Sequence, residues 1–317
     1  MRLIAVVVTY NRPTELNNCL KALINQSKRP DHIVIVNNGN HVELDSFSDY
    51  KTLFTVLRLP NLGSAGGQAE GIKEALNLQA TDIYLLDDDG IPAHNAIEKL
   101  IFARSRFGNP EDLVLTSFTY DAENGNYAPV YKAEEGVPKC PTEIFFGPEE
   151  IPKELIQNGV FMNWGQFFLG VLIPASFARK IGLPIPEFFI RGEDFEYLLR
   201  CLRNGRVGTV LDSSFQHPMP LTDDNQEPPL SGVKKYYQLR NHMIVRRQYF
   251  PRVRNHPLCR VGKYIFEAFK EKITGCRFDW IRFIAYYDAI FQNLNRDGRK
   301  VVEWANSPVK RCQFWEI

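Results

Sequence analysis

The sequence predicts an α/β fold with a mostly parallel central sheet flanked by helices. In the first third of the 317-residue chain, short β-branched runs alternate with helical patterns, which is typical of βαβ units. The strand candidates are apolar at successive positions, which indicates strands covered on both faces. Ligands of such sheets bind at the carboxyl ends of the strands, so polar residues that follow a strand are the first candidates for a site.

The elements of the first part follow one another closely. LIAVVVT, HIVIVN, LFTVLRL and DIYLLD predict strands over residues 3–9, 32–37, 53–59 and 82–87. A helix is expected after the first strand and another after Gly67. The apolar face of the first helix is formed by Leu16, Leu20, Leu23 and Ile24.

Beyond residue 110 the pattern is less regular. LVLTSFTY predicts a strand over residues 113–120, and a long loop is expected over 121–158. There follow an apolar segment over 161–174, a helix over 174–182, the acidic segment PEFFIRGEDFEYLLRCLRNG and a strand over 207–217. From Gly232 onward the pattern becomes helical, basic and aromatic.

The formal charges divide the chain in two. Residues 1–231 carry 20 basic and 30 acidic side chains, whereas residues 232–317 carry 18 and 7. We therefore expect an α/β domain over 1–231 and a separate helical, basic C-terminal region over 232–317.

The composition excludes several classes of protein. With 44% hydrophobic and 24% charged residues, the chain is neither disordered nor collagen-like. No apolar run approaches the ~18 residues that span a bilayer. The six cysteines form no CxxC pair, which argues against a structural zinc site and against a disulfide framework. We expect reduced thiols in a cytosolic protein.

Three adjacent aspartates, Asp87, Asp88 and Asp89, end the apolar strand DIYLLD. Neighbouring like charges repel, and a divalent cation would relieve the repulsion; oxygen ligands favour Mg²⁺ or Mn²⁺. A solvated turn would explain the aspartates without a ligand.

The segment Asn61-Leu62-Gly63-Ser64-Ala65-Gly66-Gly67 is a loop of small residues before a helix. Free backbone amides at a helix start suit a phosphate or a closely approaching sugar. A turn that needs positive φ would explain the glycines equally well.

Glu193 and Asp194 stand where a loop turns into a helix, followed later in the chain by His217 after a strand. Either carboxylate could cap the helix, or one could act as a general base. His217 could be a metal ligand or a loop histidine without a ligand.

Taken in chain order, these motifs resemble those of inverting family-2 glycosyltransferases, whose fold is the nucleotide-diphospho-sugar type called GT-A. Within the family the sequence is most similar to bacterial galactofuranosyl- and rhamnosyltransferases of surface polysaccharide synthesis. The segments that carry the resemblance are VVVTYNRPTELNNCLKAL, IVIVNNGN, NLGSAGG, LLDDDG, FFIRGEDFEYLLR, FQHP and YYQLRN.

The resemblance implies a role for each motif. Asp194 would be the catalytic base, and Glu193 would shape the acceptor site. Asp89 and His217 would bind Mn²⁺ or Mg²⁺, with Asp87 as a further candidate ligand. The residues implied to contact the donor are Thr9, Tyr10, Arg12, Asn37, Asn61, Gly63, Gly66, Gly67, Asp87 and Asp88.

The implied reaction is the metal-dependent, inverting transfer of a sugar from a UDP or dTDP donor to a hydroxyl group. The acceptor would be a glycan or lipid-linked glycan of bacterial O-antigen, capsule or cell wall. UDP-galactofuranose is the favoured donor and dTDP-rhamnose the alternative. Asn37 stands where many relatives have aspartate, and Ile190 and Arg191 stand where galactofuranosyltransferases often have tryptophan.

Two other functions would use the same fold. A non-catalytic nucleotide-sugar-binding scaffold in a polysaccharide assembly complex would not need the acidic motifs, which are intact here. A nucleotidyltransferase usually has a glycine-rich loop after its first strand, where this chain reads TYNRPTE.

The C-terminal region interleaves basic with aromatic and aliphatic residues between Val261 and Phe291. Such helices suit an anionic membrane surface, so we expect a cytoplasmic protein at the inner face of the cytoplasmic membrane. Packing on the catalytic domain or on a second copy of the chain explains the pattern equally well. No nucleic-acid recognition motif accompanies the charge, so no nucleic-acid partner is expected.

Overall fold

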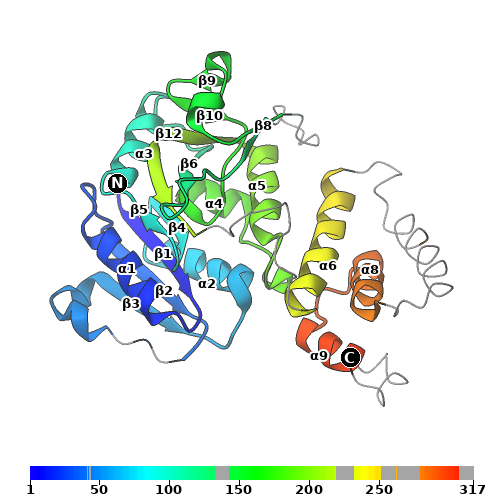
Figure 1. The fold of residues 1–317 in the computed structure, drawn as a ribbon. Coiled ribbons are helices and arrows are strands. Elements are labelled where there is room, and N and C mark those ends of the chain that lie inside the picture. The colour runs from blue at the N-terminus through cyan, green and yellow to red at the C-terminus, as the bar shows by residue number, and fades with distance from the viewer. Residues whose placement is uncertain are drawn as a thin grey trace. The chain divides into compact units, whose positions relative to one another are not determined.

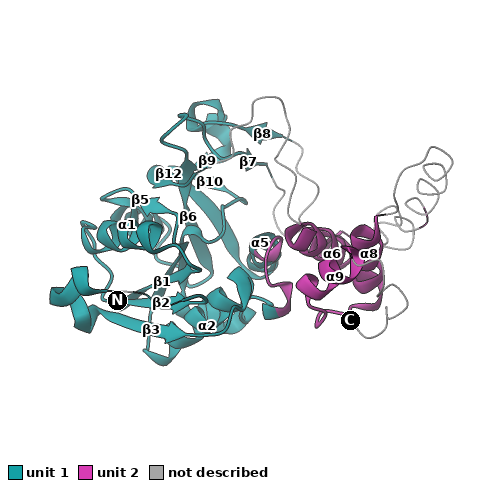
Figure 2. Ribbon diagram, turned by 60° about the horizontal axis from the view of Figure 1, so that its bottom comes forward, with its two compact units in different colours: residues 1–186, 194–221 teal, residues 187–193, 222–317 magenta. Residues whose placement is uncertain are grey.

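The computed structural model describes residues 1–40, 42, 44–132, 143–218, 232–250, 262 and 279–306. The chain forms two units, shown in Figure 2: unit 1 comprises Met1–Pro186 and Asp194–Leu221, and unit 2 comprises Glu187–Glu193 and Thr222–Ile317. Residues 219–231 lie outside the described part, so the domain boundary at residue 231 stays a prediction.

Unit 1 is built on a ten-stranded sheet, in which the order of the main path is β3-β2-β1-β4-β11-β6-β12-β10-β9 (Figure 1). The first four strands of this path are parallel, β12 is parallel to β6, and β11 is antiparallel to both of its neighbours. The predicted α/β fold with a mostly parallel sheet is therefore confirmed. The principal strands are β1 (Leu3–Thr9), β2 (His32–Asn37), β3 (Phe54–Arg58), β4 (Asp82–Asp87), β6 (Leu113–Tyr120), β11 (Leu169–Pro174) and β12 (Arg206–Gln216).

Shorter strands complete the sheets of unit 1. Strand β5 (Ile91–Pro92) pairs with the end of β12, and β9 (Ile156–Gln157) and β10 (Val160–Met162) extend the far edge. Strands β7 (Val130–Tyr131) and β8 (Ile144–Phe145) form a separate two-stranded sheet. Strands β7, β8 and β9 lie within residues 121–158, the segment expected to be a loop.

Helices cover both faces of the sheet. Leu3, Ala5 and Val7 of β1 belong to the same buried cluster as the apolar residues of α1 (Pro13–Ile24) and α3 (Ala96–Ser105). Helix α2 (Gly63–Asn77) lies against the alternate residues of β1, which point to the other face. The remaining α-helices of unit 1 are α4 (Ala175–Ile181) and α5 (Glu193–Asn204), whose first residue is counted in unit 2.

Helix α2 begins earlier than expected. The prediction that it starts after Gly67 is wrong, because Gly63, Gly66 and Gly67 all lie within it. A Cβ atom on Gly67 would lie 2.6 Å from Cγ1 of Val8, and one on Gly71 would lie 2.2 Å from Cγ1 of Val6. Gly67 and Gly71 let the helix approach β1 closely, so they are packing residues of the helix.

The described helices of unit 2 are α6 (Gly232–Tyr249), α8 (Trp280–Phe291) and α9 (Gly298–Asn306). They enclose a small core whose buried members are Tyr236, Tyr237, Ile284, Ala285, Val301 and Trp304. Residues 261 and 263–278, which hold much of the aromatic and basic pattern expected to face a membrane, lie outside the described part. Among the helices that are described, none combines the length and apolar character needed to cross a bilayer.

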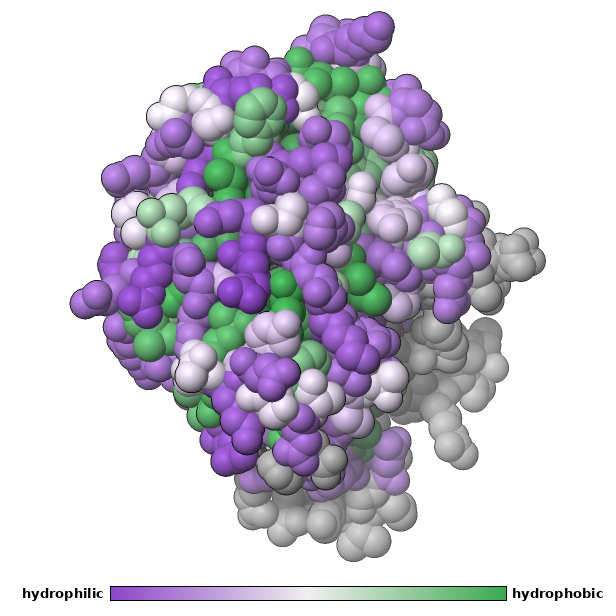
Figure 3. All heavy atoms as spheres, turned by 90° about the vertical axis from the view of Figure 1, so that its left-hand side faces the viewer, coloured by the Kyte–Doolittle hydropathy of each residue, from purple (hydrophilic) through white to green (hydrophobic). Residues whose placement is uncertain are grey.

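The face of the molecule in Figure 3 is mostly hydrophilic, with smaller hydrophobic areas between the polar side chains. Phe102 is one of the exposed large hydrophobic residues of unit 1, and the Arg106 guanidinium lies over its ring, 4.9 Å from the centroid. Single exposed apolar side chains of this kind are ordinary.

Candidate functional site

The three aspartates lie in a short turn, Asp87–Gly90, which we name the aspartate turn. Its backbone is held by the sheet: Asp88 N donates to Val8 O (3.2 Å), and Asp87 N donates to Phe168 O (3.0 Å). Because β1 and β4 are parallel with Val8 opposite Asp87, the turn begins beside the carboxyl end of β1. The aspartates therefore stand at the edge of the sheet where ligands usually bind.

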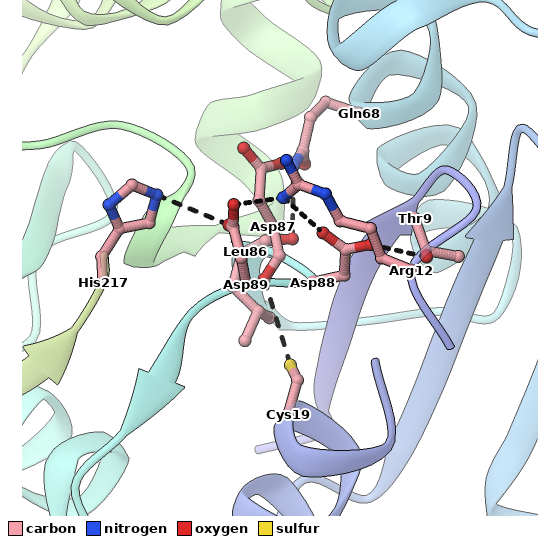
Figure 4. Close-up of polar contacts among 9 residues, drawn as sticks. All are labelled: Thr9, Arg12, Cys19, Gln68, Leu86, Asp87, Asp88, Asp89 and His217. Atoms are coloured by element: carbon pink, nitrogen blue, oxygen red, sulfur yellow. Dashed lines mark hydrogen bonds and ion pairs between the residues drawn. The ribbon is translucent and has the colours of Figure 1, made fainter. Parts of the chain in front are cut away.

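The strand after the turn explains how Asp89 reaches a distant part of the sequence. Ile91 pairs with Gln216 in the antiparallel pairing of β5 and β12, which brings Asp89 beside His217. His217 Nε2 lies 3.4 Å from Asp89 Oδ1 (Figure 4). A Cβ atom on Gly90 would lie 2.1 Å from Cζ of the buried Phe215, so the turn requires glycine there.

The last residue of β1 and a residue shortly after it bind the other side of the turn. Thr9 Oγ1 donates to Asp88 Oδ2 (2.6 Å). The Arg12 guanidinium donates to Asp89 and lies 3.5 Å from Asp88 Oδ1 (Figure 4). Arg12 is half-exposed, so its positive charge partly offsets the acidic cluster while remaining open to solvent.

The three carboxyl groups differ in their affinity for protons. Burial and the negative charge of Asp89 raise the pKa of Asp87 to about 7, against the hydrogen bond from Gln68. Burial also raises the pKa of Asp88 to about 6, although Thr9 donates to it. Burial opposes ionisation of Asp89 as well, but the hydrogen bonds and charges of His217 and Arg12 lower its pKa to about 2. The turn thus carries negative charge near neutral pH that Arg12 offsets only in part, which favours a cationic ligand.

Gln68 is a site residue that the sequence reasoning missed. It is fully buried on α2, and its Nε2 donates to Asp87 Oδ1 (3.0 Å; Figure 4). The sequence signal that could have found it is the single polar side chain, Gln68, on the buried helix face that carries Ala65, Ala69 and Ile72. The Cys19 sulfur, 4.0 Å from Asp87 O, packs beneath the turn.

The asparagines at the end of β2 and after β3 organise the neighbouring loops. Asn37 is buried, and its side chain binds its own turn by donating to Asn40 O (2.6 Å) and accepting from Gly39 N (2.9 Å). Asn61 Oδ1 accepts from Gly63 N (3.0 Å), and buried Asn38 donates to Gly63 O (2.9 Å). The structure therefore gives Asn37 and Asn61 local roles in the turns; their predicted donor contacts, and that of Tyr10, which is 52% exposed, stay predictions.

Glu193 and Asp194 form the first turn of α5. Glu193 is 7% exposed, whereas Asp194 is exposed and its Oδ1 accepts from Phe195 N (2.7 Å). Both carboxylates stand at a helix N-terminus, where negative charge interacts favourably with the helix dipole. An exposed carboxylate can accept a proton from a bound hydroxyl group.

The residues around Asp89 fit a divalent cation whose ligands come partly from the protein and partly from the substrate. The described residues contain no group of three or more His, Cys, Asp or Glu side chains that could hold a metal ion. The pair formed by Asp89 and His217 offers one oxygen and one nitrogen 3.4 Å apart, which suits two adjacent positions on one ion. Mg²⁺ is commonly held by one or two carboxylates plus substrate phosphates, so two protein ligands suffice.

Comparison with known sequences identifies relatives that match most of the chain. A galactofuranosyltransferase GlfT1 of Mycolicibacterium smegmatis (strain ATCC 700084 / mc(2)155) is 27% identical over 300 residues, which cover 88% of this chain and 93% of the relative. GlfT1 of Mycobacterium tuberculosis (strain ATCC 25618 / H37Rv) is 31% identical over 245 residues, or 72% of this chain and 73% of the relative. The dTDP-rhamnosyl transferase RfbF of Shigella flexneri is 25% identical over 258 residues, with 78% and 81% covered.

Solved structures share the fold at lower sequence identity. A crystal structure of GalNAc-T7 with UDP, GalNAc and Mn²⁺ matches 77% of this chain with a TM-score of 0.55 at 17% identity. This chain covers 48% of that protein, about half its length. The crystal structure of S. aureus TarS 1-349 matches 96% of this chain and 90% of its own, with a TM-score of 0.51 at 13% identity.

The family model described as Glycosyl transferase family 2 matches residues 4–170, which is more than half of the chain. The match runs from β1 into β11 and includes the aspartate turn. With this match and the 31% identity to the mycobacterial relative, the chain belongs to glycosyltransferase family 2 and is a glycosyltransferase with the GT-A fold.

Proposed function

We propose that this enzyme is a metal-dependent, inverting glycosyltransferase that takes a sugar from a nucleoside diphosphate. The observation that carries the proposal is the meeting of Asp89 with His217 and Arg12 at the carboxyl edge of the sheet. Donor diphosphates need positive charge, and this cluster offers one guanidinium and a pair of cation ligands. Asp87 and Asp88 are proposed to contact the nucleoside side of the donor.

Mn²⁺ or Mg²⁺ on Asp89 and His217 would supply charge that neutralises the leaving nucleoside diphosphate. Arg12 already lies against Asp88 and Asp89, so it can bind the same phosphates once its carboxylate partners are engaged. Thr9 orients Asp88 by its hydrogen bond. Backbone amides at the start of α2, near Gly63, are further candidates for contact with the donor.

Asp194 is the proposed base. Its carboxylate accepts the proton of an acceptor hydroxyl while that oxygen forms a bond to the anomeric carbon, and the bond from this carbon to the diphosphate oxygen breaks. A single displacement from the opposite face inverts the anomeric centre, whereas the two-step mechanism of retaining glycosidases restores it. Glu193 is buried and directly precedes Asp194 in the sequence, and it is proposed to shape the acceptor site.

UDP-galactofuranose is the donor that we favour, because relatives named galactofuranosyltransferase GlfT1 match this chain over up to 88% of its length. The relative named dTDP-rhamnosyl transferase RfbF, 25% identical, supports dTDP-rhamnose as the second candidate. The proposed acceptor is a hydroxyl of a glycan or lipid-linked glycan in a bacterial surface polysaccharide. The excess of 18 basic over 7 acidic residues in 232–317 supports placement at an anionic membrane surface.

The donor is tested by incubating the full chain with UDP- and dTDP-sugars, with Mn²⁺ or with chelator, and measuring release of nucleoside diphosphate. We expect release from UDP-galactofuranose that chelator abolishes. Release only from dTDP-rhamnose would select the second donor. A scaffold would bind nucleotide-sugar without releasing diphosphate, and a nucleotidyltransferase would instead form or consume pyrophosphate.

The base is tested by Asp194→Asn, which keeps the shape of the side chain and removes its basicity. We expect kcat to fall by about 10²- to 10⁴-fold while the affinity for donor, measured by calorimetry, is unchanged. Glu98→Gln, in the first turn of α3, is the matched control, because Glu98 is also an exposed carboxylate there. Wild-type turnover in Asp194→Asn would contradict the assignment.

A further inference from the structure

The segment before Asp194, Glu187–Glu193, has an unusual backbone and belongs to unit 2; we name it the clamped loop. Phe189, Arg191 and Gly192 have φ of 60°, 68° and 94°. A positive φ at a non-glycine residue costs about 1–3 kcal/mol in conformational free energy, and it persists only where the surrounding structure enforces it. The clamped loop is therefore held in place by specific contacts.

Asn241 of α6 makes the first set of these contacts. Its Nδ2 donates to Phe188 O (2.8 Å), to Arg191 O (2.8 Å) and to Ile190 O (3.3 Å). One fully buried amide thus binds three carbonyl groups across the strained part of the loop. An unpaired carbonyl in this position would carry a desolvation cost, so the amide specifies the path of the backbone.

Arg240 makes the second set. Its side chain is fully buried, and its guanidinium donates to Glu187 O, to Leu294 O (3.0 Å) and to Asn241 Oδ1 (3.0 Å). It therefore binds the start of the clamped loop and orients the amide that binds the rest. The planar fork of arginine makes these contacts in fixed directions that a lysine ammonium could not reproduce.

Two tyrosines of α6 support this arrangement. The Arg240 guanidinium lies over the rings of Tyr236 and Tyr237, 5.4 and 4.9 Å from their centroids. Tyr237 stacks on Phe189 of the clamped loop, with ring centroids 4.9 Å apart. The motif YYQLRN thus uses one helix face, at positions i, i+1, i+4 and i+5, to hold a single loop.

We infer that Arg240 and Asn241 are positioning residues for the transfer reaction: they orient the start of α5 and with it the proposed base Asp194. The inference rests on the proposed function of Asp194. The clamped loop ends at Glu193 and Asp194 follows it directly, so the backbone path set by Asn241 leads into the first turn of α5. Misplacement of a reacting group by about 1 Å can cost 10²-fold in rate.

The test compares Asn241→Ala and Arg240→Lys with Val301→Ala in the full chain. Val301 is fully buried in the core of unit 2. Its truncation should therefore lower the stability of unit 2 while the hydrogen bonds of Arg240 and Asn241 to the clamped loop remain. We expect both clamp variants to lower kcat by about 10- to 100-fold with donor affinity, measured by calorimetry, within about twofold of wild type. Val301→Ala should lower the melting temperature and leave kcat unchanged.

An activity-independent measurement covers the case in which Asn241→Ala is poorly folded. Hydrogen exchange of the amides from residue 188 to 195, measured without substrate, should be faster in Arg240→Lys than in wild type and unchanged in Val301→Ala. Exchange at wild-type rates, or equal loss of kcat in Val301→Ala, would overturn the inference in favour of a purely stabilising role.

A double variant separates this inference from the proposed function. If Asn241 acts through Asp194, Asn241→Ala should cause little further loss of turnover when combined with Asp194→Asn. A full, multiplicative loss would overturn the positioning role and leave the base intact. High activity of Asp194→Asn alone would instead overturn the base assignment.

Discussion

The aspartate turn and the clamped loop place carboxylates by different physical means. In the aspartate turn, backbone groups of Asp87 and Asp88 bond to neighbouring backbone, and the pairing of β5 with β12 sets the position of Asp89. In the clamped loop, backbone carbonyls are bound by the side chains of Arg240 and Asn241. The first region should therefore keep its shape when a side chain changes, whereas the second depends on residues remote in sequence.

Gly90→Ala should have the largest effect on the aspartate turn, because it displaces the backbone of the turn and leaves the carboxylates themselves unchanged. Its Cβ would lie 2.1 Å from Cζ of Phe215, which is fully buried on β12. Overpacking of this kind typically costs about 1–3 kcal/mol. Since the turn must shift away from β12, we expect Asp89 to separate from His217 and the affinity for UDP with Mn²⁺ to fall by about 100-fold, a loss of ~2.7 kcal/mol.

Calorimetry with UDP and Mn²⁺ measures this loss, and a second substitution checks its cause. Phe215→Leu in the Gly90→Ala background removes the ring that the new methyl group meets, so it should restore most of the affinity. Phe215→Leu alone is the control. If Gly90→Ala lowers the melting temperature but binds UDP as wild type does, the β5–β12 pairing is not what positions the donor site.

Gly192→Ala makes the corresponding challenge to the clamped loop. The residue has a φ of 94°, and its Cβ would lie 3.2 Å from Cδ2 of His242 and 3.3 Å from Cβ of Asn241. The loop must therefore move relative to α6, and we expect kcat to fall by about tenfold, ~1.4 kcal/mol, with donor affinity unchanged. Steady-state kinetics beside calorimetry with UDP separate the two quantities.

Gly108→Ala is the matched control for this prediction. Gly108 has a similar φ, 77°, but a Cβ there would have no neighbour within 4 Å. It should therefore report the cost of the backbone conformation alone, as a lower melting temperature with unchanged kcat. Equal loss of kcat in both variants would show that contact with α6 is unimportant.

The two regions also differ in how far the sequence alone predicts them. Strand-end placement of Asp87–Asp89 follows from the apolar run before them, because parallel strands bring their carboxyl ends to one edge. The approach of His217 to Asp89 depends on the two-residue strand β5, whose pairing leaves no periodic signal. Gln68 was missed because the sequence pattern does not distinguish a buried glutamine that binds a site residue from one that is merely tolerated on the apolar face of a helix.

The clamped loop is harder still to predict from sequence. The residues of YYQLRN are recognisable as a motif. The groups that Asn241 binds are backbone carbonyls, however, and every residue has one, so the sequence does not show which carbonyls are bound. Positive φ at Phe189 and Arg191 contradicts local propensity. One local bond, from Ile190 N to Phe188 O (2.7 Å), spans Phe189, and the tertiary contacts with α6 add to it. Local rules fail here because a distant helix overrides them, as is common where structure serves a site.

The smallest expected effect concerns the charge that the aspartate turn carries without a bound cation. Burial and the charge of Asp89 raise the pKa of Asp87 from 3.8 to about 7. The folded state then holds a proton that the unfolded state has lost, so this group's contribution to stability falls as pH rises from about 4 to about 7. Asp87→Asn removes the titration, and the metal-free variant should be more stable than wild type at pH 8.

We expect a gain of about 1 kcal/mol at pH 8 that shrinks as the pH is lowered to 5. At ~1.4 kcal/mol per pKa unit the full shift from 3.8 to about 7 would correspond to about 4 kcal/mol, and we expect less because the residue is partly exposed and solvent screens its charge. Thermal unfolding of metal-free protein between pH 5 and 8 measures it. Asp89→Asn is the opposite control: its pKa is lowered to about 2, so its ionised form stabilises the fold throughout this range. That variant should be less stable than wild type at pH 5, and the deficit should shrink toward pH 8, because loss of the Asp89 charge also lowers the pKa of Asp87. A gain of stability at pH 8 in both variants would mean that the two neighbouring carboxylates are not distinguished by Gln68 on one side and by His217 and Arg12 on the other.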